Sequence, residues 1–381
     1  MRAPIVNPIV IAAGGTGGHF FPAEALASEL LARGQRVALM TDSRTAQENF
    51  AVFSHAERFI IKGAGIAGRG PVQAAKAAAA LVAGTLQARR ILALINASAV
   101  IGFGGYPSVA PVLATRLLRR RAVVVLHEQN AVLGRANRFL ARHADILALN
   151  FPDTARLPPG VRAEVTGLPV RAAIGALATR AYTPPGESFA LLVLGGSLGA
   201  RVFSDIVPPA LAALPPALRA RLHVTQQCRA EDLERVRAAY DASGIVADLA
   251  PFFTDIAERL GAAHFVIARA GASSVAELAS AGRPSILVPL PNAIDDHQAA
   301  NARTLEALGG AWVMAQSQFT AEALCARLEK LITDPASLIL AARAARGGAH
   351  ENAAARLADT VEKLIPDARP QDVRPQDARR R

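Results

Sequence analysis

The chain has 381 residues, 51% of them hydrophobic and 19% charged, which is enough apolar material for two packed domains. Its two cysteines lie far apart without a CxxC or Cys/His cluster, which argues against a disulfide scaffold or structural zinc. No apolar run approaches the roughly 20 residues of a bilayer span, and none follows a signal-peptide pattern. The net charge is +11, and residues 1–170 hold 19 Arg and Lys against nine Asp and Glu, which points to an anionic partner: nucleic acid, a phosphorylated ligand or an acidic membrane.

The first predicted elements are a strand, a glycine-rich turn and a helix. The apolar run Ile5–Ala13 leads into GGTGGH at residues 14–19, and Phe20–Leu31 follows with the pattern of a helix. Pro22 suits an early helical position. A glycine turn from a strand into a helix directs backbone N–H groups at an open helix N-terminus, where phosphate binds well. His19 adds a titratable group at the same place.

The rest of the first half repeats this alternation of strand and helix, which predicts a mostly parallel sheet with helices on both faces. Its further strand candidates are Val37–Thr41, Ala99–Gly102, Val123–His127 and Ile146–Leu149.

A second series follows a break at Gly167–Arg171 and a loop or linker at Tyr182–Gly186. Phe189–Leu194 again enters a glycine loop, at Gly195–Ala200. We therefore predict an α/β protein with two Rossmann-like, doubly wound parallel-sheet domains, at residues 1–170 and 171–349, with a cleft between them. The later strand candidates are Leu222–Thr225, His264–Ala268 and Ser285–Pro289.

The C-terminal end differs from both series. Asn352–Leu364 is amphipathic and helical, whereas residues 367–381 form a basic, low-complexity tail that we expect to be disordered.

The three glycine loops that follow predicted strands do not match the dinucleotide-binding fingerprint, which needs glycine at its first, third and sixth positions. The sixth position is Phe20 when counted from Gly15 and Pro107 when counted from Gly102, and the third is Ser197 when counted from Gly195. No GxxxxGK[ST] or HExxH motif occurs either. The mismatch of the three loops counts against nicotinamide enzymes, and the two absent motifs argue against P-loop NTPases and zinc peptidases.

Four segments follow predicted strands and should lie at carboxyl sheet edges, where open α/β sheets bind ligands. They are GGTGGH at 14–19, GFGGY at 102–106, HEQN at 127–130 and RAGASSVAE at 269–277. Together with GLPVR at 167–171 and GGSLGA at 195–200, this ordered set resembles the MurG family of peptidoglycan glycosyltransferases over about residues 9–365. The resemblance implies the GT-B fold, in which a donor cleft separates two Rossmann-like domains and the last helix, here at 350–366, packs back on the first domain.

The same resemblance implies inverting transfer of N-acetylglucosamine from UDP-N-acetylglucosamine to lipid I, giving lipid II, with no cofactor or metal. Glu277 matches a glutamate that accepts hydrogen bonds from both ribose hydroxyls, and the start of its helix would hold the diphosphate. Phe253 matches a residue that reads uracil through its backbone, and Gln298 and Asn130 match contacts to the sugar. The expected donor-binding residues are Thr16, Gly17, Gly18, Asn130, Arg171, Ser197, Phe253, Ala272, Ser273, Ser274, Val275, Ala276, Glu277 and Gln298.

Lipid I would bind the first domain, with its pyrophosphate at the first glycine loop. The catalytic base that accepts the proton of the acceptor hydroxyl is expected to be His19 or Glu128, and the sequence leaves both open. His127 reads as a packed residue at a strand end. Simpler roles also stand: the serines could cap helices, and Arg171 could pair with an acid across the hinge. The expected acceptor-binding residues are Gly14, Gly15, Gly104, Gly105 and Tyr106.

Apolar residues alternate with cations from Ile60 to Arg90, which is typical of an interfacial membrane patch or, alternatively, of an amphipathic helix packed on the sheet. With the resemblance, we expect a peripheral protein of the cytoplasmic face of the bacterial inner membrane. Its partners would be that anionic surface and other cell-wall synthesis proteins, not nucleic acid. Two other function classes remain, a UDP-sugar epimerase or nicotinamide enzyme and a noncatalytic nucleotide-sugar-binding protein.

Overall fold

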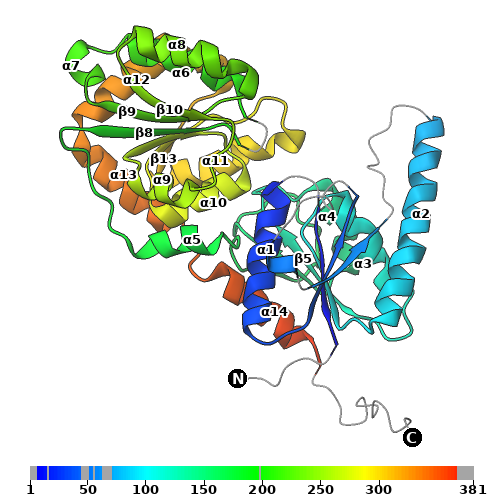
Figure 1. Ribbon diagram of the computed structural model, residues 1–381. Coiled ribbons are helices and arrows are strands. Elements are labelled where there is room, and N and C mark those ends of the chain that lie inside the picture. The colour runs from blue at the N-terminus through cyan, green and yellow to red at the C-terminus, as the bar shows by residue number, and fades with distance from the viewer. Residues whose placement is uncertain are drawn as a thin grey trace, which may run out of the picture.

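The computed structural model describes residues 7–14, 17–43, 51–54, 56–61, 71–196 and 199–366, which form two parallel-sheet α/β domains (Figure 1). The predicted fold class is confirmed. The first sheet has seven strands in the order β3-β2-β1-β4-β5-β6-β7, and every neighbouring pair is parallel. Its strands are β1 Ile9–Ala12, β2 Val37–Thr41, β3 Glu57–Ile60, β4 Ala99–Gly102, β5 Val123–Glu128, β6 Ile146–Leu149 and β7 Ala163–Val165.

The strand order of this sheet reverses between β1 and β4, where Ala12 pairs with Gly102. Loops after the two strands at such a switch point diverge to opposite sides of the sheet and leave a crevice between them. The loops here are the first glycine turn and the GFGGY segment, so topology brings two of the predicted motifs together. The helical elements of this domain are α1 Gly17–Ala32, η2 Ala51–Phe53, α2 Pro71–Leu94, η3 Tyr106–Ser108, α3 Val109–Thr115, α4 Arg135–Leu140 and η4 Ala141–His143.

The second sheet has six parallel strands in the order β10-β9-β8-β11-β12-β13, which reverses between β8 and β11. The GGSLGA loop follows β8 and the RAGASSVAE segment follows β11, so the second switch point unites the other glycine motifs. The strands are β8 Phe189–Leu194, β9 Leu222–Gln227, β10 Val246–Ala250, β11 Phe265–Ala268, β12 Ser285–Leu287 and β13 Ala311–Val313. The helical elements from here to the end of the described chain are α5 Ala172–Gly175, η5 Ala176–Thr179, α6 Arg201–Ala212, α7 Pro216–Arg219, η6 Ala230–Asp232, α8 Leu233–Ala242, α9 Ile256–Ala262, α10 Ala272–Ala281, η7 Ile294–Asp296, α11 His297–Ala307, η8 Gln316–Gln318, α12 Ala321–Thr333, α13 Pro335–Gly347 and α14 Ala353–Leu364.

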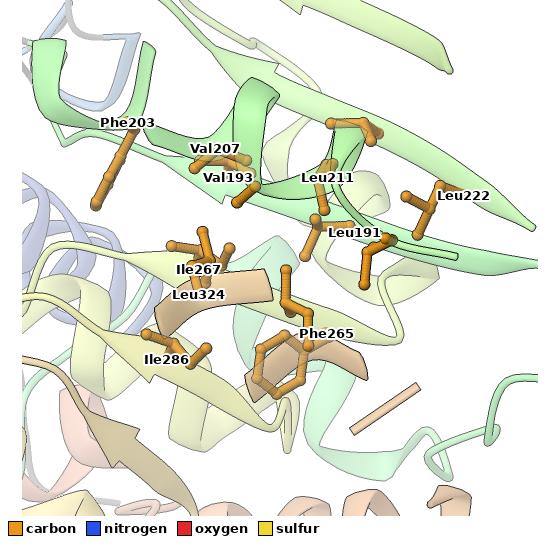
Figure 2. Packing of buried hydrophobic residues seen from close by; sticks show 14 of the residues in the cluster. Leu191, Val193, Phe203, Val207, Leu211, Leu222, Phe265, Ile267, Ile286 and Leu324 are labelled. Carbon is orange, nitrogen blue, oxygen red and sulfur yellow. The ribbon is translucent and has the colours of Figure 1, made fainter. Parts of the chain in front are cut away.

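The core of the second domain forms where one face of its sheet meets α6 and α12 (Figure 2). Leu191 and Val193 on β8 and Ile267 on β11 alternate along their strands and pack against Phe203 and Leu324 of the two helices. Strands covered on both faces read as continuous apolar runs, which is why the sequence revealed them.

The last helix, α14, returns to the first domain and runs beside α1 (Figure 1). Its residues Leu357 and Val361 are fully buried within the first domain's core. Arg33 at the C-terminal end of α1 pairs with Asp359 at 2.6 Å and Glu362 at 2.8 Å. Apolar burial supplies the driving force for this docking, and the ion pairs orient the helix.

Helix α2 lies along the outer side of α3 (Figure 1) and leaves much of its apolar surface uncovered. Val82 is 61% exposed and Leu86 is 48% exposed, beside the exposed cations Lys76, Arg89 and Arg90. By length and composition alone, its segment Val72–Leu94 would be long and apolar enough to cross a membrane. The sequence expectation that no segment is long enough was therefore wrong on that criterion, because the alanine-rich helix continues through isolated cations.

Candidate active site

The two domains meet at the start of helix α1. Pro22 lies inside this helix and has no backbone N–H, so it cannot donate to the carbonyl of Gly18 one turn earlier. Instead, the Ser273 hydroxyl at the start of α10 donates to Gly18 O at 3.1 Å. The N-termini of the two helices are thus neighbours, and their dipoles together favour an anion at the junction.

Gly14 precedes α1 at a point where a side chain would be crowded. A Cβ atom there would lie 3.1 Å from both Pro107 Cγ and Thr41 Oγ1. The glycine therefore lets the turn after β1 lie directly on the segment after β4. Gly17 and Gly18 form the first turn of α1, as a phosphate-binding turn requires.

His19 lies in the first turns of α1 with its ring half-buried. Its Nδ1 atom is 3.0 Å from Phe103 O and 2.7 Å from Gln129 Nε2. The Phe103 carbonyl can only accept, so it favours the tautomer with a proton on Nδ1. The Gln129 amide nitrogen, which also donates to Phe103 O at 3.3 Å, favours a lone pair on Nδ1. The tautomer that Phe103 favours leaves the lone pair on Nε2. Burial lowers the pKa of His19, although the Phe103 carbonyl and Glu128 oppose that shift.

Glu128 ends β5 with its carboxylate almost completely buried. Its Oε1 accepts from the backbone N and side-chain Nδ2 of Asn130, at 3.0 and 3.1 Å. Its Oε2 accepts from Gly134 N at 2.8 Å and Asn137 Nδ2 at 2.9 Å. Four donors surround the carboxylate, so its main interaction is with the loop that leads from β5 to α4.

Asn130 joins this loop to the second domain. Its Oδ1 accepts from Asn301 Nδ2 on α11 at 3.1 Å, and Asn301 Oδ1 accepts from the neighbouring Ala131 N at 2.8 Å. Asn301 also donates to Ala270 O at 3.2 Å and is fully buried. One amide therefore contacts the loop after β5 and the loop after β11 at once.

On the second domain, Glu277 of α10 pairs with Arg171 from the hinge. The Arg171 Nη2 and Nε atoms lie 2.8 and 3.2 Å from Glu277 Oε1, and its guanidinium lies 4.8 Å from the centre of the Phe21 ring. Burial raises the pKa of Glu277, and Arg171 opposes the shift. Both contacts fall on Oε1, which leaves Oε2 for a further donor. Arg171 therefore forms the ion pair at the hinge that the sequence analysis considered, and its partner is Glu277, the residue predicted to bind the ribose.

The first turn of α10 provides free backbone donors from Ala272, Ser273 and Ser274, whereas Val275 N already donates to Gly271 O at 3.0 Å. The cap residue of α10 is Gly271, and no side chain caps the helix. The serine hydroxyls are therefore not used as N-caps here. The side chains of Val275 and Ala276 line a cavity of about 360 Å³ on the hinge side of the helix.

Two further predicted donor contacts lie on loops of this domain. The Phe253 ring is buried beneath the Arg259 guanidinium, 4.1 Å from its centre, so only its backbone is offered to a ligand. Gln298 begins α11, and its Oε1 accepts from Leu290 N at 2.9 Å. The Gln298 side chain is thus held against the preceding loop.

The segment after β4 carries the predicted acceptor residues. Gly104 and Gly105 have φ values of 85° and 67°, which favour glycine. A Cβ atom on Gly104 would lie 3.6 Å from the His19 ring, an ordinary contact distance, so the positive φ and not the histidine is what favours glycine here. The Tyr106 hydroxyl donates to the Asp42 carboxylate at the end of β2.

His127 lies one residue before Glu128 and is fully buried. Its Nε2 lies 2.9 Å from Gly167 O, and its ring packs beside Phe103. Burial lowers the pKa of His127 to about 4. It stays neutral in the core, as its position at the strand end predicts.

Comparison with known proteins decides the family. Residues 9–148 match the glycosyltransferase family 28 N-terminal domain, and residues 190–361 match its C-terminal domain. A protein of Granulibacter bethesdensis is 58% identical over 365 residues, which cover 95% of each chain. The chain belongs to glycosyltransferase family 28. That relative is named UDP-N-acetylglucosamine--N-acetylmuramyl-(pentapeptide) pyrophosphoryl-undecaprenol N-acetylglucosamine transferase.

Solved structures agree with this family 28 assignment. The crystal structure of MurG from Acinetobacter baumannii aligns with a TM-score of 0.76 at 32% identity, over 94% of this chain and 100% of that one. The GT-B fold and the MurG resemblance are confirmed. A UDP-GlcNAc 2-epimerase from Neisseria meningitidis, solved with UDP-GlcNAc bound, aligns with a TM-score of 0.66 at 11% identity, over 93% and 100% of the two chains. That likeness shows the fold alone, so sequence rather than fold separates the transferase from the epimerase alternative.

Several residues of this family 28 site escaped the sequence reasoning. Asn301, Asn137 and Gln129 hold loops or the His19 ring, and Pro22 frees the Gly18 carbonyl. The signal in the sequence that could have identified them is a polar amide residue within an apolar segment, since Asn301 and Asn137 are both buried. Three predicted residues, Gly15, Thr16 and Ser197, lie outside the described residues.

Proposed function

We propose that this glycosyltransferase transfers N-acetylglucosamine from UDP-N-acetylglucosamine to lipid I and so forms lipid II. The 58% identical relative that carries this activity in its name supports the proposal. The structural observation that carries it is the hydrogen bond from Ser273 to Gly18 O, which joins the start of the donor-side helix to the first glycine turn. A sugar diphosphate held by one helix would therefore lie next to an acceptor held by the other.

In this proposal the donor binds mainly to the second domain. Glu277 Oε2 accepts the ribose hydroxyls while Oε1 keeps Arg171, because one carboxylate oxygen offers two lone pairs. The free N–H groups at the start of α10 and the Arg171 guanidinium bind the diphosphate. Gln298 and Asn130 bind the sugar from opposite domains.

The reaction is an inverting displacement in which the acceptor hydroxyl attacks the anomeric carbon and UDP leaves. We assign the general base to His19, since the tautomer favoured by Phe103 leaves Nε2 unprotonated and burial keeps the ring neutral. Glu128 is a poorer base because four donors already bind its oxygens. Charge that develops on the diphosphate is stabilised by the two helix N-termini and by Arg171.

A lipid-linked acceptor requires association with the membrane, and we place it at the cytoplasmic face of the inner membrane. Helix α2 supports a peripheral mode, because exposed Val82 and Leu86 stand beside exposed Lys76, Arg89 and Arg90. Other cell-wall synthesis proteins would meet the enzyme at this surface. The neighbouring residues 62–70, which belong to the predicted membrane patch and also carry cations, lie outside the described residues.

Incubation of the protein with radiolabelled UDP-N-acetylglucosamine and a lipid I analogue tests the proposed function. Label should move to the lipid together with stoichiometric release of UDP. His19→Ala should abolish transfer and still bind UDP-N-acetylglucosamine. Release of UDP without labelled lipid would refute the transferase assignment, and an N-acetylmannosamine product would favour an epimerase.

A further inference from the structure

An ion-pair cluster joins the domains beside the predicted sugar site. Asp295 lies on the loop before α11, and its carboxylate accepts from Arg138 of α4 and, at 2.6 Å, from Arg156 after β6. Arg135 Nε lies 3.6 Å from the same carboxylate. All three arginines belong to the first domain and Asp295 to the second, so this contact depends on how the domains are arranged.

The backbone on both sides of this contact is in a sparsely populated conformation. Asp295 and Asp296 have φ values of 56° and 54°, and Arg156 has a φ of 64°. Non-glycine residues in this left-handed region cost free energy and persist where surrounding contacts hold them. The ion pair between Asp295 and Arg156 is such a contact, and it connects the loop before α11 with the loop after β6.

The loop that carries Asp295 also carries the sugar contact. Gln298 follows three residues later and is held by Leu290 N on the other side of the loop. Asn301, one turn further along α11, bonds to the first-domain residue Ala131. A change in the loop's position would therefore move Gln298 relative to Asn130, the residue expected to bind the sugar from the first domain.

We propose that Asp295 is a positioning residue for the donor sugar: its pairing with Arg135, Arg138 and Arg156 closes the domains and holds the loop at 290–298 so that Gln298 meets the sugar. This inference rests on the proposed function. Without the Asp295 charge, the three arginines would lose their attraction to the second domain at that point, so the closed arrangement would be less favoured. The hydrogen bond from Arg156, followed by the charges of Arg138 and Arg135, also lowers the pKa of Asp295, so the carboxylate stays ionised at neutral pH.

Asp295→Asn tests the proposal, with Asp296→Asn as the matched control. Asp296 has the same backbone conformation and charge one residue away, but it is exposed and forms no ion pair with an arginine among the residues that the structure describes. We expect Asp295→Asn to raise the KM for UDP-N-acetylglucosamine about tenfold, with a smaller change in the KM for the lipid I analogue. Asp295→Glu should recover part of the loss, and Asp296→Asn should behave as wild type.

Salt and a double-mutant cycle give independent readouts. Between about 50 and about 500 mM NaCl the wild-type donor KM should rise as screening weakens the ion pairs, and that of Asp295→Asn should change much less. Arg138→Gln should add little to Asp295→Asn, whereas Arg142→Gln, on the next turn of the same segment, should have no effect in either background.

Three outcomes overturn the proposal: a donor KM of Asp295→Asn equal to that of Asp296→Asn, equal salt dependence of both variants and wild type, or full additivity with Arg138→Gln. Each of these would be seen in an active transferase. A wild-type protein that transfers no sugar would instead refute the proposed function, so the two failures are distinguishable.

Discussion

Replacement of Glu128 by glutamine distinguishes the two candidate bases. The Glu128 side chain is 3% exposed, and two donors bind each carboxylate oxygen. A glutamine amide has one acceptor oxygen, so its NH2 group must face two donors whichever way it turns. The substitution therefore removes two charge-assisted hydrogen bonds and leaves buried donors on the loop after β5 unpaired.

The size of the effect follows from those contacts. A hydrogen bond to a charged group contributes about 1.5–3 kcal/mol, so two lost bonds should lower the free energy of unfolding of the first domain by about 3–6 kcal/mol. At about 2–4 °C per kcal/mol for domains of 150–250 residues, the Tm should fall by roughly 6–24 °C. Turnover should fall as well, because Asn130 and Gly134 lose their anchor.

The assay is the pH dependence of kcat/KM, together with the Tm of each variant. If His19 is the base, activity falls on the acid side as its ring takes up a proton, with a midpoint below the ordinary value near 6.5 because burial lowers the pKa of His19. Glu128→Gln should keep this acid limb with a lower plateau. Glu164→Gln, which removes an exposed carboxylate from the same domain, controls for the change in charge.

A different result would refute this reasoning. If Glu128→Gln melts at the wild-type temperature but loses the acid limb and most of its turnover, Glu128 carries the proton and the hydrogen-bond argument fails. Asn137→Ala, which removes one of the four donors, gives a milder perturbation should Glu128→Gln fold poorly. That variant should lose stability and keep the acid limb.

Three further predictions address the donor, the core and the membrane surface. Glu277→Gln should raise the KM for UDP-N-acetylglucosamine about tenfold or more in initial-rate assays, since one oxygen must serve both Arg171 and the ribose; an unchanged KM would contradict the ribose role. The pKa of His127 is about 4 in the folded state, against the ordinary value of 6.5, so the unfolded chain takes up a proton at this residue first as the pH falls. About 2 kcal/mol of the free energy of unfolding should therefore be lost between pH 7 and pH 5. His127→Gln should flatten that slope in denaturant titrations, and an equally steep slope would exclude His127 as its source. Asp substitutions at both Val82 and Leu86 should abolish retention of the protein on anionic vesicles at low salt, whereas an Asp at Val246, which is also exposed but lies on the other domain, should not. Equal retention of all variants would exclude docking through α2.

The strands of both sheets were predictable where they are buried on both faces. β1 and β4 lie at the middle of the first sheet and are apolar throughout, so their sequences stand out. The outer strands β3 and β7 escaped prediction because they are short and mostly exposed, and their residues carry no continuous apolar run. Tertiary pairing with β2 and β6 is what makes them strands.

The candidate site was predictable wherever backbone conformation requires a particular residue. Gly14, Gly104 and Gly105 leave room for neighbouring groups or adopt positive φ, and such requirements appear in the sequence as glycine. The choice between His19 and Glu128 was not predictable, because it depends on which donors the fold brings around each side chain. Glu128 obtains four donors only when the chain between β5 and α4 folds back on it.

By itself the sequence determined the two Rossmann-like halves, the order of the motifs at their carboxyl edges and the family, since these follow from local patterns of glycine and apolar residues. The tertiary structure alone decided which groups meet between the halves: Ser273 with Gly18, Arg171 with Glu277 and Asp295 with its arginines. These partners lie more than 100 residues apart, so no local pattern encodes their distance. Their meeting depends on how the two sheets are oriented by the hinge and by α14, and that orientation is set by packing across the whole molecule.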